Sequence, residues 1–204
     1  CSFRGSVTSS KSKSDYAGGI VGGTQNPSTI TGCANFGMIS GYAGGIAGYG
    51  KISIENCYNT GKINGTTRAG GIIGQFNGTA GTNTVENSYS MGSITLSGDS
   101  DACSGGISGY NGTITNCYWT YPENGTGNNT GTLTDSGKIE NAPGLAEKLG
   151  AAFVEDTNNA NNGWPILTWQ AGMGPVQEVP GISITSTNGG TIWAEAGDNH
   201  KTST

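Results

Sequence analysis

The amino-acid sequence predicts an all-β fold of the parallel β-helix (β-solenoid) type, with a short helical, tryptophan-rich cap toward its C-terminus. Three observations predict this fold. A Gly-Gly-Ile-x-Gly pentad occurs four times, at residues 18–22, 44–48, 70–74 and 105–109. A Gly-x-aliphatic element precedes each pentad, and an aliphatic-x-x-Cys or aliphatic-x-x-Ser element follows it. Glycine accounts for 38 of 204 residues and hydrophobic residues for only 33%, which is unlike a conventional globular core.

Each repeat therefore contains three short segments, and none of them can bury its aliphatic residue alone. Stacked copies can bury it, because neighbouring strands lie about 4.8 Å apart and each side chain covers the next. Glycine tolerates the unusual backbone dihedral angles that the corners require. We expect three interior columns of equivalent residues: Val7/Ile39/Ile63/Ile94, Ile20/Ile46/Ile72/Ile107 and Ile30/Ile54/Val85/Ile114.

The repeat pattern is expected to end near Cys117, before a loop at residues 124–131. Residues 141–150 predict one short helix with Pro143 in its first turn. The apolar segment 164–169 is expected to join this helix in a cap that closes the open end of the stack. The predicted organisation is a β-solenoid at 1–136, a cap at 137–171, and a linker with the start of another β module at 172–204. We take the chain to be part of a longer protein.

One repeat position carries four of the five cysteines, and serine replaces the missing one: Cys1, Cys33, Cys57, Ser88 and Cys117. The odd cysteine count and the serine argue against a fixed disulfide framework. No Cys-x-x-Cys cluster indicates a metal site. We expect a buried column of reduced thiols, with one disulfide between neighbours such as Cys33 and Cys57 as the alternative. The fifth cysteine lies at another position, aligned with three larger residues: Cys103 with Tyr16, Tyr42 and Arg68.

Tyrosines follow the cysteine column by one residue, at Tyr58, Tyr89 and Tyr118. Strand alternation points them outward if the cysteines point inward. They would form either an exposed binding platform or a stack of rings that stabilises the fold. A second aromatic set follows the pentads and could be a binding surface or loop packing: Tyr49, Phe76 and Tyr110, with Trp119 and Tyr121 nearby. The predicted ligand-binding residues are Tyr58, Tyr89, Tyr118, Tyr49, Tyr110 and Trp119.

Charge and composition exclude several classes of function. The chain has 9 basic and 14 acidic residues, the reverse of a nucleic-acid-binding surface. It has no run of 18 apolar residues, so we expect no membrane insertion. The single histidine, His200, weakens most catalytic triads and metal sites. Glu55 and Glu86 are aligned but isolated, so we expect no enzyme, no cofactor and no metal.

The pentads, the Asn-Cys-Tyr elements at residues 56–58 and 116–118, and the Gly-x-Ile elements together resemble the GLUG repeat. Residues 161–170 resemble the segment that commonly closes such arrays, so the resemblance covers roughly residues 1–170. It implies a right-handed β-helix in a secreted or surface-attached bacterial protein. Such repeats occur in adhesin-like chains and in non-catalytic regions of IgA1-protease-like metallopeptidases. The resemblance carries no catalytic residues, and the His-Glu-x-x-His motif is absent.

These inferences favour a non-catalytic, extracellular adhesion or ligand-binding segment whose partner is a glycan or a host or cell-surface protein. A structural spacer between other domains is one alternative, and it predicts no ligand. A β-helix enzyme that degrades polysaccharides is another, and it would depend on Glu55 or Glu86. A protease exosite that recognises immunoglobulin rests on family analogy alone.

Overall fold

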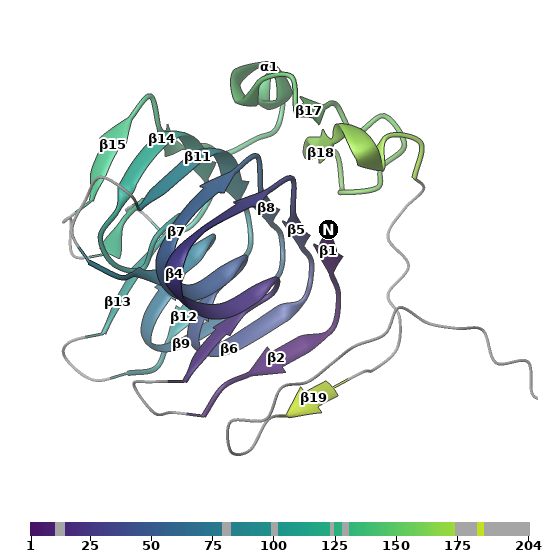
Figure 1. Ribbon diagram of the computed structural model, residues 1–204. Helices are drawn as coiled ribbons and strands as arrows, with labels where there is room; N and C mark the ends of the chain where they lie inside the picture. Colours follow the sequence, from purple (N-terminus) through teal and green to yellow (C-terminus); the bar gives the residue numbers. More distant parts are fainter. Residues whose placement is uncertain are drawn as a thin grey trace, which may run out of the picture.

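The computed structural model describes residues 1–10, 15–78, 83–98, 102–122, 125–127, 131–173 and 183–185. Over these residues the chain is all-β with very little helix, and its two larger sheets are parallel (Figure 1). The predicted all-β class is therefore confirmed. Most of the β module predicted at 172–204 lies outside the described residues.

The larger sheet follows the order β1-β5-β8-β11-β14-β15, with the other strands paired beside this path. Its strands are β1 (Ser2–Phe3), β4 (Val21–Thr31), β5 (Ala34–Asn35), β7 (Ala47–Glu55), β8 (Tyr58–Asn59), β10 (Ile73–Phe76), β11 (Thr84–Ser90), β14 (Thr113–Trp119), β15 (Thr132–Thr134) and β16 (Gly137–Lys138).

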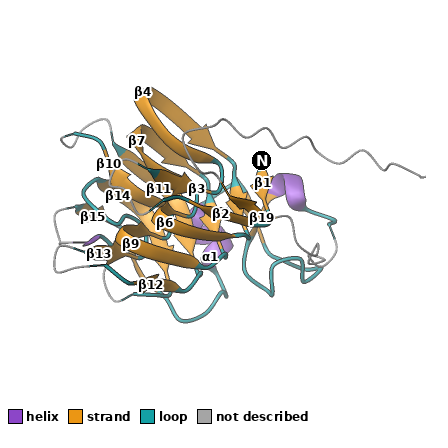
Figure 2. Cartoon of the chain, turned by 90° about the horizontal axis from the view of Figure 1, so that it is seen from below, coloured by secondary structure: helices purple, strands orange, loops and turns teal. Residues whose placement is uncertain are grey.

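The second sheet follows the order β12-β9-β6-β2-β19, with β3 paired to β6 and β13 paired to β9. Its strands are β2 (Ser6–Thr8), β3 (Tyr16–Gly18), β6 (Met38–Gly44), β9 (Ile63–Gly70), β12 (Ile94–Leu96), β13 (Cys103–Gly105) and β19 (Ser183–Thr185). Figure 2 shows the strands of successive repeats lying next to one another across the molecule.

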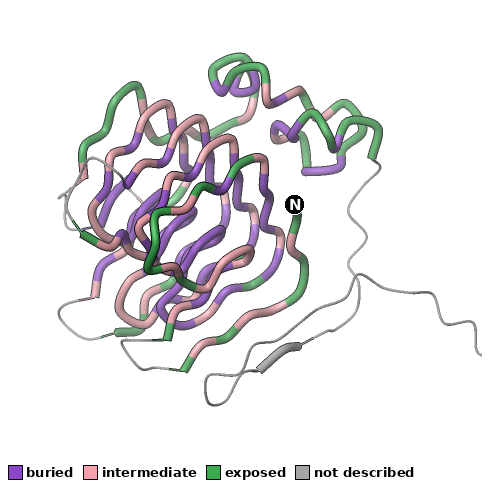
Figure 3. The backbone as a smooth tube through the Cα atoms, in the orientation of Figure 1, coloured by how far each residue is buried: buried purple, intermediate pink, exposed green. Residues whose placement is uncertain are grey.

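Successive repeats form layers that each begin at the Cys or Ser position: layer 1 is residues 1–32, layer 2 is 33–56, layer 3 is 57–87, layer 4 is 88–116 and layer 5 is 117–135. Equivalent residues of neighbouring layers pair in register, and buried and partly buried residues alternate along the strands (Figure 3). All three predicted columns are confirmed by strand register and by backbone hydrogen bonds between their members.

The sequence predicted that the repeats end near Cys117, and this prediction is wrong, because one more layer follows. Leu133 pairs with Ile114 and extends the third aliphatic column, and Ser136 takes the position of the cysteines. The sequence pattern did not identify layer 5, because this layer has no pentad. Its strands are short, and β15 is fully exposed.

The pentads mark a bend at which the backbones of neighbouring layers come very close. A Cβ atom at Gly71 would lie 2.1 Å from the carbonyl oxygen of Gly106 in the next layer. A Cβ atom at Gly44 would lie 1.9 Å from the carbonyl oxygen of Ala47 on the other side of the same bend. Only glycine fits these positions, so the Gly-Gly pair follows from close packing.

The Cys or Ser side chains form a hydrogen-bond ladder along the stack, which we call the thiol–hydroxyl ladder. Each γ atom donates to the carbonyl oxygen two residues earlier, as Cys57 Sγ does to Glu55 at 3.1 Å and Ser88 Oγ does to Glu86 at 2.8 Å. The Cys57 N–H in turn donates to Ser88 Oγ at 3.0 Å. The residue before each step has a positive φ, as at Asn56 with φ 51°. The γ atoms therefore satisfy backbone groups at this corner, and either Cys or Ser can do so.

A second interior ladder consists of side-chain amides two residues further along. Asn35 Nδ2 donates to Asn59 Oδ1 at 2.7 Å, and Asn59 Nδ2 donates to Ser90 Oγ at 3.3 Å. In layer 5 the equivalent position is Trp119. Its ring fills the space beside Gly106, so a bulky side chain follows the polar ladder at that end of the interior.

The cap consists of α1 (Leu145–Leu149), β17 (Phe153–Val154), β18 (Ile166–Leu167) and a 3-10 turn at Thr168–Gln170. It lies along the side of the stack (Figure 1). The prediction that it closes the open end is therefore wrong. The cap instead covers an apolar strip formed by three successive layers: Ala34, Tyr58 and Tyr89 pack against Leu145, Leu149, Phe153 and Leu167. Burial of this strip gives the cap far more apolar contact than one exposed layer edge would.

Candidate functional site

The predicted tyrosine platform is not exposed. Tyr58 and Tyr89 point away from the interior of the stack, as alternation requires, but both are completely buried under the cap. Their rings stack with centroids 5.0 Å apart and planes within 4° of parallel. Burial raises the pKa of both phenols. The prediction that these two residues form an exposed ladder is therefore wrong, because the sequence pattern gave no sign that the cap packs sideways.

The C-terminal segment of the cap holds this tyrosine stack through polar contacts. Tyr58 Oη donates to Gln170 Oε1 at 2.8 Å. Asn161 Nδ2 donates to Tyr89 Oη at 2.7 Å, and Tyr89 Oη donates to the carbonyl oxygen of Pro165. Trp164 stacks on Tyr89 with ring centroids 6.2 Å apart. The polar and aromatic residues of this segment thus have a structural role in docking the cap.

Two more predicted binding residues, Tyr118 and Trp119, are also not freely exposed. Tyr118 is partly buried, donates to Asn116 Oδ1 at 2.9 Å and lies 5.6 Å from the ammonium group of Lys148. Trp119 is only 4% exposed and belongs to the interior. A ligand on the surface cannot reach Trp119, which corrects its prediction as a binding residue.

The other two predicted residues, Tyr49 and Tyr110, are partly exposed and belong to a surface that extends along the stack. We call it the tyrosine–arginine strip; it consists of Tyr16, Tyr49, Arg68 and Tyr110, and the buried ring of Tyr42 packs against it. Tyr16 and Tyr49 stack with centroids 4.2 Å apart and planes 11° from parallel. Tyr42 meets Tyr16 edge to face at 5.4 Å. The Arg68 guanidinium lies over the Tyr110 ring at 4.1 Å from its centroid.

The strip has a repeating geometry. Tyr16 comes before the pentad of layer 1 and stacks on Tyr49, which follows the pentad of layer 2. Arg68 comes before the pentad of layer 3 and stacks on Tyr110, which follows the pentad of layer 4. The bend at each pentad therefore brings the residues on its two sides together, and consecutive layers interleave their planar side chains.

Electrostatics within the strip follow from this packing. Burial raises the pKa of Tyr16, with smaller contributions from Tyr49 and Tyr42. Burial lowers the pKa of Arg68, but contacts with Cys103 and Tyr42 outweigh that effect, so the net shift is upward. Arg68 is thus a fixed positive charge held flat between an aromatic ring and a thiol.

Sequence reasoning placed Tyr16, Tyr42 and Arg68 in one aligned column but did not assign them to a site. The usable signal was the spacing on the two sides of each pentad. A residue two positions before one pentad meets the residue one position after the pentad of the next layer. Phe76, also in the second aromatic set, is buried in the interior and is not part of the strip.

The carboxylates considered for catalysis lie in β7 and β11. Glu55 and Glu86 are paired in register on neighbouring layers. Among the described residues, no group of three or more His, Cys, Asp or Glu side chains could hold a metal ion. Within the same residues, no helix has the length and apolar character needed to cross a bilayer.

Parallel strands in register, with a glycine pentad at each bend, define a β-structured repeat protein. The GLUG motif matches residues 39–64, which run from β6 to β9 and span about one full layer. A proposed immunoglobulin A1 protease from Bacteroides ovatus has a similar solved structure, with a TM-score of 0.57 and 26% identity. The similarity covers 83% of this chain and 56% of that chain, so this chain spans little more than half of that protein's length. No curated protein sequence matches the chain.

Proposed function

We propose that this chain is a non-catalytic binding segment of an extracellular, secreted or surface-attached bacterial protein, and that its layers are coils of a right-handed parallel β-helix. The observation that carries the binding function is the tyrosine–arginine strip. It places three partly exposed tyrosine rings and one guanidinium on a rigid scaffold. Parallel in-register strands and the GLUG motif support the β-helix assignment.

The chemistry of the strip suits a polar partner with some flat apolar surface. Tyrosine combines a large ring with a hydroxyl that can donate and accept, and arginine donates to carboxylate or carbonyl oxygens. Both residue types are enriched where proteins bind partners. Mutual stacking already fixes the side chains, so little rotamer entropy is lost on binding. The ligand we propose is a glycan or a host or cell-surface protein.

The proposed location and context rest on the comparisons. The GLUG match and the similarity to a proposed immunoglobulin A1 protease favour a secreted or surface-attached bacterial protein. Because the chain spans 56% of that protein, we propose that it works beside other domains of a longer chain. A non-catalytic role is favoured because, among the described residues, Glu55 and Glu86 belong to no group of three or more His, Cys, Asp or Glu side chains that could hold a metal ion.

A binding screen tests this function. The folded chain is passed over a glycan array printed together with human immunoglobulin A and extracellular-matrix proteins. A hit should be lost in the Tyr49→Ala/Tyr110→Ala variant. The matched control is Tyr121→Ala, which removes a tyrosine that is 54% exposed and lies outside the strip. Binding that survives in the strip variant would refute the assignment of this surface.

One observation favours a structural spacer as the second candidate. The most regular aromatic feature of the sequence, the tyrosine stack, is used internally to dock the cap. A spacer needs rigidity and no ligand. The same screen separates the two functions, because a folded chain that binds nothing on the array supports the spacer.

A further inference from the structure

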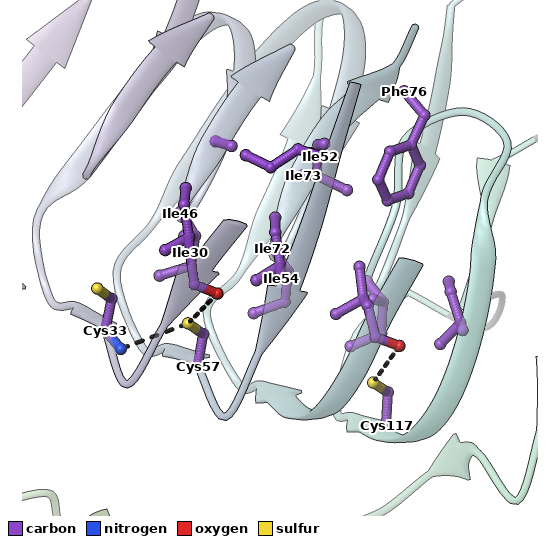
Figure 4. Close-up of a cluster of buried hydrophobic side chains, with 14 of the residues drawn as sticks. Ile30, Cys33, Ile46, Ile52, Ile54, Cys57, Ile72, Ile73, Phe76 and Cys117 are labelled. Atoms are coloured by element: carbon purple, nitrogen blue, oxygen red, sulfur yellow. Dashed lines mark hydrogen bonds between the residues drawn. The ribbon is translucent and has the colours of Figure 1, made fainter. Parts of the chain in front are cut away.

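The thiol–hydroxyl ladder contains two pairs of neighbouring thiols, Cys1 with Cys33 and Cys33 with Cys57, and the second pair lies within the stack. Cys33 and Cys57 open layers 2 and 3, and the Cys33 N–H donates to Cys57 Sγ at 3.4 Å (Figure 4). Ser88 opens layer 4, so Cys57 and Cys117 are separated by a serine. All five cysteines are free thiols, and Cys1, at the start of layer 1, is exposed.

The register brings the two thiols within reach of a disulfide. The neighbouring residues pair directly, Thr31 with Glu55 and Ala34 with Tyr58, so Cys33 lies opposite Cys57. Strands about 4.8 Å apart place the two Cα atoms inside the range of about 4.4–6.8 Å that disulfides span. Closure would replace the S–H···O bonds of Cys33 to Thr31 and of Cys57 to Glu55, together with the weak N–H···S bond.

The two thiols differ in access and in acidity. Cys33 is 6% exposed, whereas Cys57 is completely buried. Interaction with the neighbouring Cys57 side chain lowers the pKa of Cys33 to about 6, with a smaller contribution from the N-terminal ammonium group, although burial acts in the opposite direction. The same contact, together with burial, raises the pKa of Cys57. Because the thiolate is the nucleophile, Cys33 is suited to attack and Cys57 to resolve.

We propose that Cys33 and Cys57 form a thiol–disulfide exchange site that reacts with low-molecular-weight disulfides and closes into a disulfide between layers 2 and 3. The Cys33 thiolate attacks one sulfur of the small disulfide, breaks its S–S bond and releases one small thiolate. The Cys57 sulfur then attacks the Cys33 sulfur of the mixed disulfide, and the second small thiol leaves with the Cys57 proton. Two protein thiols are oxidised, and one small disulfide is reduced to two thiols.

Closure would join adjacent layers covalently at the corner where the ladder normally joins them by hydrogen bonds. The serine positions explain why no such disulfide is expected further along the ladder. Ser88 and Ser136 complete the same hydrogen bonds without a redox-active atom. The site is independent of the tyrosine–arginine strip, so its failure would leave the proposed binding function untouched.

The test uses the full chain and oxidised glutathione as the small disulfide. After reaction, remaining thiols are blocked by alkylation in acid, and the protein is digested and analysed by mass spectrometry. We expect a peptide pair joined through Cys33 and Cys57. Recovery of both residues as free thiols, a mixed disulfide that never closes, or pairing of Cys33 with Cys1 would each overturn the proposal.

Serine variants make the test specific. Cys57→Ser, made together with Cys1→Ser, should keep the fold, because serine already occupies two other positions of the ladder, and its reaction should stop at a mixed disulfide on Cys33. Cys1→Ser and Cys117→Ser should close as the parent chain does. A Cys1→Ser/Cys57→Ser chain that resists glutathione at Cys33 would show that Cys33 is not the attacking thiol.

Discussion

Removal of one hydroxyl, by Tyr89→Phe, tests whether the buried tyrosine stack holds the cap in place. The Tyr89 hydroxyl accepts from Asn161 Nδ2 at 2.7 Å and donates to the carbonyl oxygen of Pro165. Loss of a partner from a buried polar group costs about 1–3 kcal/mol. Asn161 Nδ2 keeps weaker bonds to Trp164 and Pro165 at 3.4 and 3.3 Å, so we expect the lower part of that range, about 1–2 kcal/mol.

The assay is urea unfolding followed by tryptophan fluorescence, because Trp164 lies against Tyr89 and reports on the cap. With a slope of about 2 kcal/mol per M, the midpoint should fall by about 0.5–1 M. The control is Tyr121→Phe, whose exposed side chain should change the free energy of unfolding by less than about 0.5 kcal/mol. Equal midpoints for Tyr89→Phe and the control would refute the argument that these hydrogen bonds secure the cap.

Three further perturbations test the interior. Gly71→Ala should prevent folding or lower the melting temperature steeply, because its Cβ would lie 2.1 Å from a backbone oxygen of the next layer. The control is Gly137→Ala, which has open space around its Cβ and should melt at the same temperature as the parent chain. Asn59→Ala interrupts the interior amide ladder and should cost about 1–3 kcal/mol in urea unfolding. Iodoacetamide should alkylate Cys33 with a rate that rises between about pH 5 and pH 7, because its pKa of about 6 makes it a thiolate above that pH. Cys117, whose pKa burial raises to about 12, should stay unmodified until the chain unfolds, and equal rates at the two cysteines would contradict the assignment.

The interior could be predicted from the sequence because each column repeats one kind of side chain at a nearly fixed spacing. Ile46 and Ile72 lie 26 residues apart, and their backbones are joined by a hydrogen bond of 2.8 Å. Layer 5 was missed because it keeps only the end of the pattern, Leu133, followed by Ser136 at the cysteine position, and has no pentad. Local periodicity thus identified layers that carry the whole motif and overlooked the one that carries part of it.

The candidate site was harder to predict, because it depends on contacts between distant segments. Alternation placed Tyr58 and Tyr89 on the outside of the stack correctly, but burial was decided by Leu145 and Leu149, more than 50 residues further along the chain. Tyr49 and Tyr110 are partly exposed, because no segment of the described part of the chain covers them in this way. The sequence period therefore predicts whether a side chain points into or out of the stack. Whether an outward side chain is buried depends on the segments that pack against it in the tertiary fold.

The sideways position of the cap has a consequence for how the molecule unfolds. A linear array with contacts only between neighbours can fray from either end, one unit at a time. Here the Trp169 indole N–H donates to Gly32 in layer 1, and Asn116 in layer 4 donates to the backbone of Lys148, so one short segment ties the first units of the array to the fourth. Loss of any unit in between would also undo those ties. The array should therefore melt in a single cooperative transition, and removal of the cap should restore gradual fraying.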